Sequence, residues 1–307
     1  LKKGKIKFID GETYIATIND VNFKYNSNKN ANELTLKGKF LGDNIYINLL
    51  NNKIDESSPK IFTLKLSDLR LFTKVNMFNS QTDKNVINGD ILFKKDKNRV
   101  TAEFDYKNNK IIFKRANLRN IFLDGKFTGE VNFLPYFDFN LDINLNSINF
   151  TKLYNYFLAL DEKKIFKINN KINGKISLSA DKINSKYNLT KSFESRIKFN
   201  NGSILIEQFL INLGKLGAVD MVGAINNDKK FTNFKFESNI FVDNRKKFLS
   251  KFGIYNKENL LSDLFIQGNF DFESIRVSFY EISGEEKFRT EDINFIESEF
   301  NELMLEN

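Results

Sequence analysis

The 307-residue chain is 41% hydrophobic and 28% charged, which argues against a disordered chain, a collagen-like fibre and a bundle of membrane helices. It has no cysteine and no histidine, which excludes disulfides, thiolate nucleophiles, Ser-His or Cys-His catalysis and imidazole metal sites. The net charge of +8 is uneven: residues 281–307 hold two basic and nine acidic residues, and the rest carries about +15. A basic body favours an anionic partner, either nucleic acid or lipid headgroups, although solvated lysines explain the same charge.

Alternation of apolar and polar residues is the dominant pattern along the chain. In chain order it appears at 21–26, 62–66, 137–145, 234–242 and 275–279. Each run predicts a half-buried strand with one apolar and one polar face. About eighteen such strands, separated by short Asn, Asp, Lys and Gly turns, predict an all-β fold built as a long antiparallel meander.

Three short helices are predicted among these strands. Thr151 is an expected N-cap for a helix over 151–160, and Asp243 for a second helix over 243–252. Thr290 precedes two acidic residues and a helical spacing of apolar side chains, which predicts an acidic amphipathic helix over 290–305.

Glycine recurs in the apolar phase of the strands. The positions at which we expect it to let the sheet curl around its apolar side are Gly38, Gly125, Gly129, Gly223 and Gly268. Asn-Gly pairs at 88–89, 173–174 and 201–202 are also turn signals, and we expect a hairpin turn at Asn201-Gly202.

Three helices cannot cover the apolar face of so many strands. A β-sandwich or a closed barrel would fill that face with its own side chains, whereas a sheet rolled into an open trough would leave an apolar lining for a lipid-like guest. A membrane barrel is disfavoured because the chain has no tryptophan for the aromatic girdles. The trough and the filled scaffold both remain open at this point.

Basic residues cluster at Lys94, Lys95, Lys97 and Arg99, and again at 245–251. Solvated loop tips, an anionic lipid surface and nucleic acid each fit such clusters. Nucleic acid is disfavoured because phenylalanine tends to occupy the opposite strand phase from lysine.

The order of features from Phe137 to Phe252 resembles the C-terminal region of the AsmA-like family, which includes the TamB and YhdP types. The long alternating strand 137–145 is followed by a short helix and by the Gly-bearing strand 172–180. A hairpin turning at Asn201-Gly202, a strand around Gly223 and a helix after Val242 complete the pattern.

This resemblance implies a non-enzymatic protein of the Gram-negative envelope, without cofactor, metal or nucleic-acid partner. It would lie in the periplasm, anchored to the inner membrane by a segment outside this sequence, and support phospholipid transport and outer-membrane biogenesis. Its partners would be phospholipid acyl chains, the membrane surface and envelope proteins. The alternative is a non-catalytic β-sandwich scaffold or interaction protein of the envelope.

The expected organisation has three parts: 1–135 as the first part of the trough, 136–282 as the AsmA-like β-rich region with inserted helices, and 283–307 as the acidic helix. The residues expected to line the groove are Leu123, Phe127, Val131, Phe133, Phe137, Phe139, Leu141, Ile143, Leu145, Ile172, Gly174, Ile176, Leu178, Phe234 and Phe236.

Overall fold

The chain forms two compact units, Leu1–Leu134 (unit 1) and Pro135–Asn307 (unit 2). The structure is a computed structural model. It describes residues 2–10, 13–53, 58–80, 82–83, 85–132, 137–158, 172–185, 189–225, 233–244, 246–247, 250, 263–272 and 274–305.

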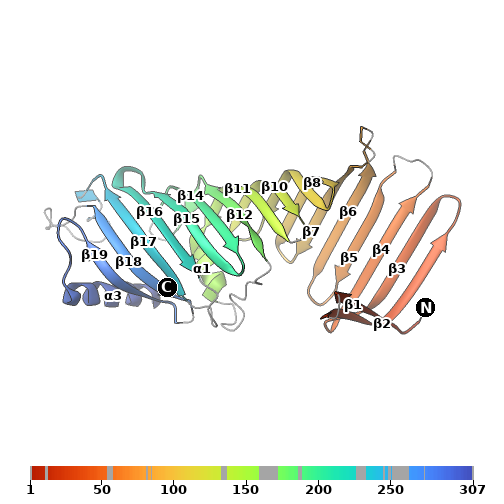
Figure 1. Ribbon diagram of the computed structural model, residues 1–307, viewed down its shortest axis with the longest axis horizontal. Helices are drawn as coiled ribbons and strands as arrows, with labels where there is room; N and C mark the ends of the chain where they lie inside the picture. Colours follow the sequence, from red (N-terminus) through yellow and green to blue (C-terminus); the bar gives the residue numbers. More distant parts are fainter. Residues whose placement is uncertain are drawn as a thin grey trace. The chain divides into compact units, whose positions relative to one another are not determined.

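Unit 1 is an antiparallel meander in which each strand pairs with the next along the chain (Figure 1). Short turns connect most strands, which is why neighbours in sequence become neighbours in the sheet. Its strands are β1 Gly4–Asp10, β2 Thr13–Ser27, β3 Ala31–Phe40, β4 Asp43–Asn52, β5 Lys60–Leu66, β6 Leu71–Asn79, β7 Ile87–Lys95, β8 Asn98–Lys107, β9 Lys110–Arg119 and β10 Leu123–Asn132.

Unit 2 continues the same plan from β14 to β19, again as an antiparallel meander. Its elements are β11 Asp138–Asn149, α1 Phe150–Leu158, β12 Asn173–Ala180, β13 Ile183–Asn184, β14 Ser192–Asn200, β15 Ser203–Asn212, β16 Gly217–Ile225, β17 Asn233–Val242, β18 Leu264–Asp271, β19 Arg276–Ser283 and α3 Thr290–Leu305. The predicted fold class, an open all-β meander with few helices, is therefore confirmed.

Two pairings depart from the predicted antiparallel order. β11 is parallel to β12, with Asp138 opposite Asn173 and Leu145 opposite Ala180, and it is also parallel to β13, with Ile148 opposite Ile183. The chain leaves β11 through α1 before it returns to β12, and parallel neighbours need such a crossover connection.

The observed helices agree in part with the three helices predicted from the sequence. α3 spans Thr290–Leu305, as predicted, with Glu291 and Asp292 in its first turn. α1 begins at Phe150, and its cap is Asn149 rather than Thr151, because the Asn149 Oδ1 accepts the Lys152 N–H at 2.8 Å. Of the helix predicted over 243–252, residues 246, 247 and 250 are helical, and half of the ten residues lie outside the described part of the chain.

Several glycines of the apolar phase lie beneath phenylalanine rings, whereas Gly38 packs against Ile18. A Cβ added at Gly89 would lie 2.5 Å from the Phe104 ring, and one at Gly223 would lie 2.5 Å from the Phe234 ring. The missing side chain therefore lets an aromatic ring lie flat on the sheet, as aromatic residues do beside glycines in designed sheets. Asn201 and Gly202 form the predicted turn, whereas Gly89 and Gly174 lie within strands.

Complete burial is confined to small regions of each unit. In unit 1 the buried cluster is Ile18, Val21, Leu36, Ile45 and Leu66, with Ile6 of β1 packed against it. Elsewhere the apolar side chains of the strands are mostly half-buried. Half-burial is the state expected of a sheet whose apolar face is not covered by a second layer.

Candidate functional site

Strand register joins the apolar side chains of unit 2 into continuous rows that cross the strands. The central apolar row of unit 2 consists of Leu141, Ile176, Ile197, Ile206, Gly223, Phe236, Gly268 and Phe279, each the Cα partner of the next. All of these side-chain positions are half-buried except Gly268, which is buried. Since neighbouring strands lie about 4.8 Å apart, the row is about 34 Å long.

Parallel rows lie on either side of this central row. One contains Phe139, Phe199, Ile204, Phe234 and Phe270. Another contains Ile143, Leu178, Phe209 and Ile266 but is interrupted by two serines, Ser195 and Ser238, which are both 6% exposed. The apolar face of unit 2 is thus several side chains wide and almost without polar groups.

Unit 1 has a row of the same kind. The central apolar row of unit 1 consists of Tyr25, Leu34, Leu49, Phe62, Val75, Ile91, Ala102, Ala116 and Phe127. It crosses nine strands, from β2 to β10, over about 38 Å. Each unit therefore has an uninterrupted apolar path across its own strands.

The residues predicted to line a groove belong to these apolar faces. Phe127 is the last member of the unit 1 row, and Leu123 and Val131 share its strand. Leu141, Ile176 and Phe236 belong to the central row of unit 2. The flanking rows of unit 2 contain five more of the predicted residues: Phe139, Gly174, Phe234, Ile143 and Leu178.

Phe137 and Ile172 directly precede β11 and β12, and Phe137 is 38% exposed. Phe133 lies outside the described residues.

Two predicted lining residues do not reach an open surface. Gly174 is buried because the Phe139 ring lies over it, 2.7 Å from the position that a Cβ would occupy. Leu145 is 3% exposed and pairs with Ala180, which pairs with Phe193. Phe150, at the start of α1, stacks on Phe193 at 5.8 Å, so this end of the face is closed beside α1.

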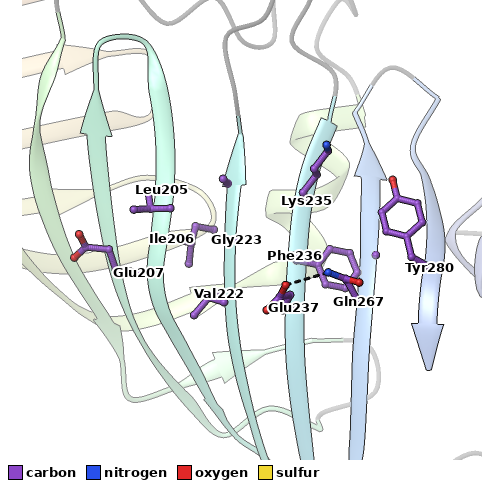
Figure 2. A pocket seen from close by; sticks show the side chains of 12 residues that line it. Leu205, Ile206, Glu207, Val222, Gly223, Lys235, Phe236, Glu237, Gln267 and Tyr280 are labelled. Carbon is purple, nitrogen blue, oxygen red and sulfur yellow. Dashed lines mark hydrogen bonds between the residues drawn. The ribbon is translucent and has the colours of Figure 1, made fainter. Parts of the chain in front are cut away.

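The opposite, polar face of unit 2 carries a shallow depression of about 610 Å³ across β15 to β19 (Figure 2). Its walls include Leu205, Val222 and Lys235, and a hydrogen bond of 3.0 Å joins Gln267 to Glu237 across it. By strand alternation these side chains point away from the apolar rows. The lining of the depression also includes Ile206, Gly223, Phe236 and Gly268, so it lies on the same strands as the central apolar row.

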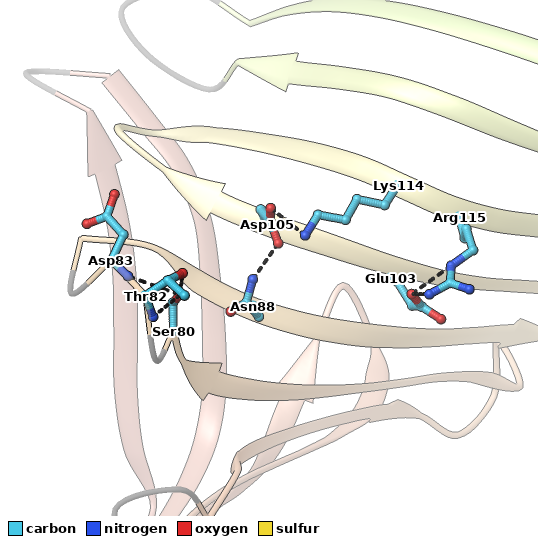
Figure 3. Close-up of polar contacts among 8 residues, drawn as sticks. All are labelled: Ser80, Thr82, Asp83, Asn88, Glu103, Asp105, Lys114 and Arg115. Carbon is cyan, nitrogen blue, oxygen red and sulfur yellow. Dashed lines mark hydrogen bonds and ion pairs between the residues drawn. The ribbon is translucent and has the colours of Figure 1, made fainter.

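Charged residues of unit 1 form cross-strand ion pairs toward one end of β8 and β9 (Figure 3). Lys114 and Asp105 lie 2.7 Å apart, and Arg115 and Glu103 lie 2.8 Å apart. Burial alone would raise the pKa of Asp105, but hydrogen bonds from Lys114 and Asn88 outweigh it and lower that pKa. These carboxylates neutralise the lysines and arginines beside them.

Most residues of the apolar rows were not singled out from the sequence. Ile197, Ile206 and Phe279 lie in runs whose alternation marks an apolar phase, so the signal existed strand by strand. Their alignment depends on irregularities in register between Arg196 and Ile197, Ile206 and Phe209, and Gln267 and Gly268. A one-residue irregularity changes which side chains face each other, and nothing local in the sequence reveals it.

The described part of the chain includes no group of three or more acidic side chains placed to hold a metal ion. No helix in that part has the length and apolar character needed to cross a membrane. Comparison of the chain with protein-family models, with curated proteins and with solved structures gives no match.

Proposed function

We propose that this protein is a non-catalytic lipid-binding protein whose two apolar faces hold phospholipid acyl chains. The observation that carries the proposal is the central apolar row of unit 2, which crosses eight strands without one polar side chain. Its length of about 34 Å exceeds the ~15 Å that an acyl chain spans in one leaflet of a bilayer.

The energetics favour an acyl chain as the guest. Each methylene group removed from water contributes about 0.8 kcal/mol, so a sixteen-carbon chain crossing water unaided costs about 12 kcal/mol. An apolar row removes much of this cost while the headgroup stays in solvent. Such a face supports movement in either direction, because a passive path adds no driving force.

The cellular setting is part of the same proposal. The resemblance of 137–252 to AsmA-like proteins supports a periplasmic location, inner-membrane anchoring through a further segment, and phospholipid transport toward the outer membrane. The alternating strand at 137–145 and the Gly-bearing strand at 172–180 carry this resemblance. The groove-bearing body would then act between the two membranes.

A filled scaffold of the envelope is the second candidate. It is favoured by the fully buried cluster around Val21 in unit 1 and by the closed end beside α1 in unit 2. In a scaffold these clusters would be the functional core, and the half-buried rows would be covered by a protein partner.

Native mass spectrometry tests the lipid proposal after incubation with neutral phosphatidylcholine vesicles. The informative variant is Ile176→Asp, in the central row of unit 2, and its control is Leu205→Asp, on the polar face at 43% exposure. We expect lipid adducts on the wild type and on Leu205→Asp, and a marked loss of adducts on Ile176→Asp.

Thermal melts separate the two candidates. In the lipid-binding protein the Ile176→Asp carboxylate stays hydrated, so the melting temperature falls little. In a filled core an unpaired carboxylate costs several kcal/mol and the variant unfolds. A wild type without lipid adducts, together with an unfolded Ile176→Asp variant, would reject the lipid proposal in favour of the scaffold.

A further inference from the structure

A second row of side chains crosses the polar face of unit 1, opposite its apolar row. We name it the outer basic row: Lys37, Tyr46, Lys65, Phe72, Lys94, Arg99 and Arg119, each the Cα partner of the next. It runs from β3 to β9 over about 29 Å and ends where Asp124 of β10 faces Arg119. Consecutive members of the row are 5 to 22 positions apart in the sequence, and the strand register aligns them.

The cations of this row are exposed and not neutralised. All five lysine and arginine side chains are exposed, and no ion pair within 4.0 Å joins any of them to an acidic residue in the described part of the chain. Lys94 faces Arg99, and Arg99 faces Arg119. Like charges placed opposite one another destabilise a sheet, so an anionic partner would relieve a repulsion built into the row.

The other end of the same strands shows the contrast. There Glu103 pairs with Arg115 at 2.8 Å and Asp105 with Lys114 at 2.7 Å (Figure 3). Asp83 pairs with Lys107 at 2.8 Å. These cations therefore have acidic partners, whereas those of the outer basic row have none within 4.0 Å in the described part of the chain.

The two aromatic residues of the row favour a lipid surface over a nucleic acid. The Lys65 Nζ lies 5.6 Å from the ring centroid of Tyr46 and 5.7 Å from that of Phe72, and the Lys37 Nζ lies 5.9 Å from that of Tyr46. Single-stranded nucleic acid binds by stacking its bases on free aromatic faces, and ammonium groups already occupy these. The exposed ammonium groups over these half-buried rings can attract the negatively charged phosphates of lipid headgroups.

The beginning of the row also has room for polar groups. A depression of about 470 Å³ lies at the Lys37–Tyr46 end, and its lining includes Lys39, Asn22 and Ser67.

We propose that the outer basic row docks unit 1 on the surface of a bilayer that contains anionic phospholipid. This goes beyond lipid binding at the apolar rows and does not depend on it, because the two surfaces lie on opposite faces of the sheet.

Vesicle sedimentation of the full chain tests the inference. The probes are vesicles of phosphatidylcholine with one third phosphatidylglycerol, and vesicles of phosphatidylcholine alone, at low and high salt. The row variant is Lys94→Gln/Arg99→Gln/Arg119→Gln. The matched control removes three exposed lysines of unit 2, as Lys175→Gln/Lys182→Gln/Lys215→Gln, and changes the net charge by the same amount.

We expect the wild type to bind the anionic vesicles and to lose that binding in high salt, which screens exposed charges. The row variant should bind at least tenfold more weakly, since each basic residue near an anionic surface contributes about 1 kcal/mol. The control should change by less than about twofold, because this contribution applies only to basic residues close to the bilayer surface. Arg99→Lys/Arg119→Lys keeps the charge and the fold, and should bind like the wild type.

Several outcomes would overturn the docking surface. Equal losses in the row variant and the control would show a general charge effect, and unchanged binding of the row variant would show that the row is not involved. Tighter binding to a single-stranded oligonucleotide than to vesicles would assign the row to nucleic acid. The lipid proposal is judged separately, because lipid adducts should persist on the row variant and vesicle docking should persist on Ile176→Asp.

Discussion

At the scale of single residues, the most informative positions are the glycines beneath aromatic rings. Gly223 faces the Phe234 ring, and Gly268 faces the Phe236 ring at 2.9 Å from the position of a Cβ. From the sequence we expect that glycine, which has no side chain, lets the sheet curl at these positions. In the structure a ring from a neighbouring strand occupies the space above Gly223 and the space above Gly268. These two glycines therefore leave no gap in the apolar face, because the rings fill the volume of the missing side chains.

Gly223→Ala should therefore destabilise unit 2. Its Cβ would lie 2.5 Å from the Phe234 ring and 2.6 Å from the Lys235 carbonyl oxygen, and overpacking of this kind costs about 1–3 kcal/mol. Urea unfolding should show a smaller cost of Gly223→Ala in a Phe234→Leu background, because the smaller side chain can move aside. An equal cost in both backgrounds would mean that the ring is not the obstacle.

At the scale of elements, α3 lies along the last strand of unit 2 (Figure 1). The Asn301 Oδ1 accepts the Val277 N–H at 2.8 Å, and the Asn301 Nδ2 donates to the Val277 carbonyl at 2.9 Å. The Glu297 carboxylate, one helical turn earlier, accepts the Phe279 N–H at 2.9 Å. These side chains satisfy backbone groups of β19 that would otherwise offer a pairing site to another strand.

Asn301→Leu should loosen this contact. It removes two hydrogen bonds, each worth about 0.5–1.5 kcal/mol, and leaves the backbone of Val277 unpaired. We expect faster amide hydrogen exchange at 276–283 and concentration-dependent self-association in sedimentation velocity. Asn294→Leu, at an exposed position of the same helix, is the control and should change neither. Unchanged exchange at 276–283 in Asn301→Leu would exclude a capping role for α3.

At the scale of the whole molecule, each unit has its own complete apolar row. The unit 1 row runs from Tyr25 to Phe127, and the unit 2 row from Leu141 to Phe279. Neither row needs residues of the other unit to be continuous across its strands. If both rows hold lipid, the protein has two sites that can be blocked one at a time.

A carboxylate in each row tests this independence. Ile91→Asp blocks the unit 1 row and Ile176→Asp the unit 2 row, while Leu92→Asp changes the polar face beside Ile91. Native mass spectra should show fewer lipids on each row variant, none on the double variant, and the wild-type number on Leu92→Asp. Complete loss of lipid in either single variant would show that the two rows act as one site.

The sequence by itself determined the strands, their apolar and polar faces, the turn at Asn201-Gly202 and the C-terminal helix, because each depends on a period or a turn preference within a few residues. It also indicated an apolar face too large for the predicted helices to cover.

Only the tertiary structure decided how the strands align, because register depends on hydrogen bonds between distant strands and on single-residue irregularities such as the one between Gln267 and Gly268. The parallel pairing of β11 with β12 and the Phe139 ring over Gly174 are consequences of that alignment. So is the row from Lys37 to Arg119, since Lys94, Arg99 and Arg119 become neighbours only when three strands pair in this register.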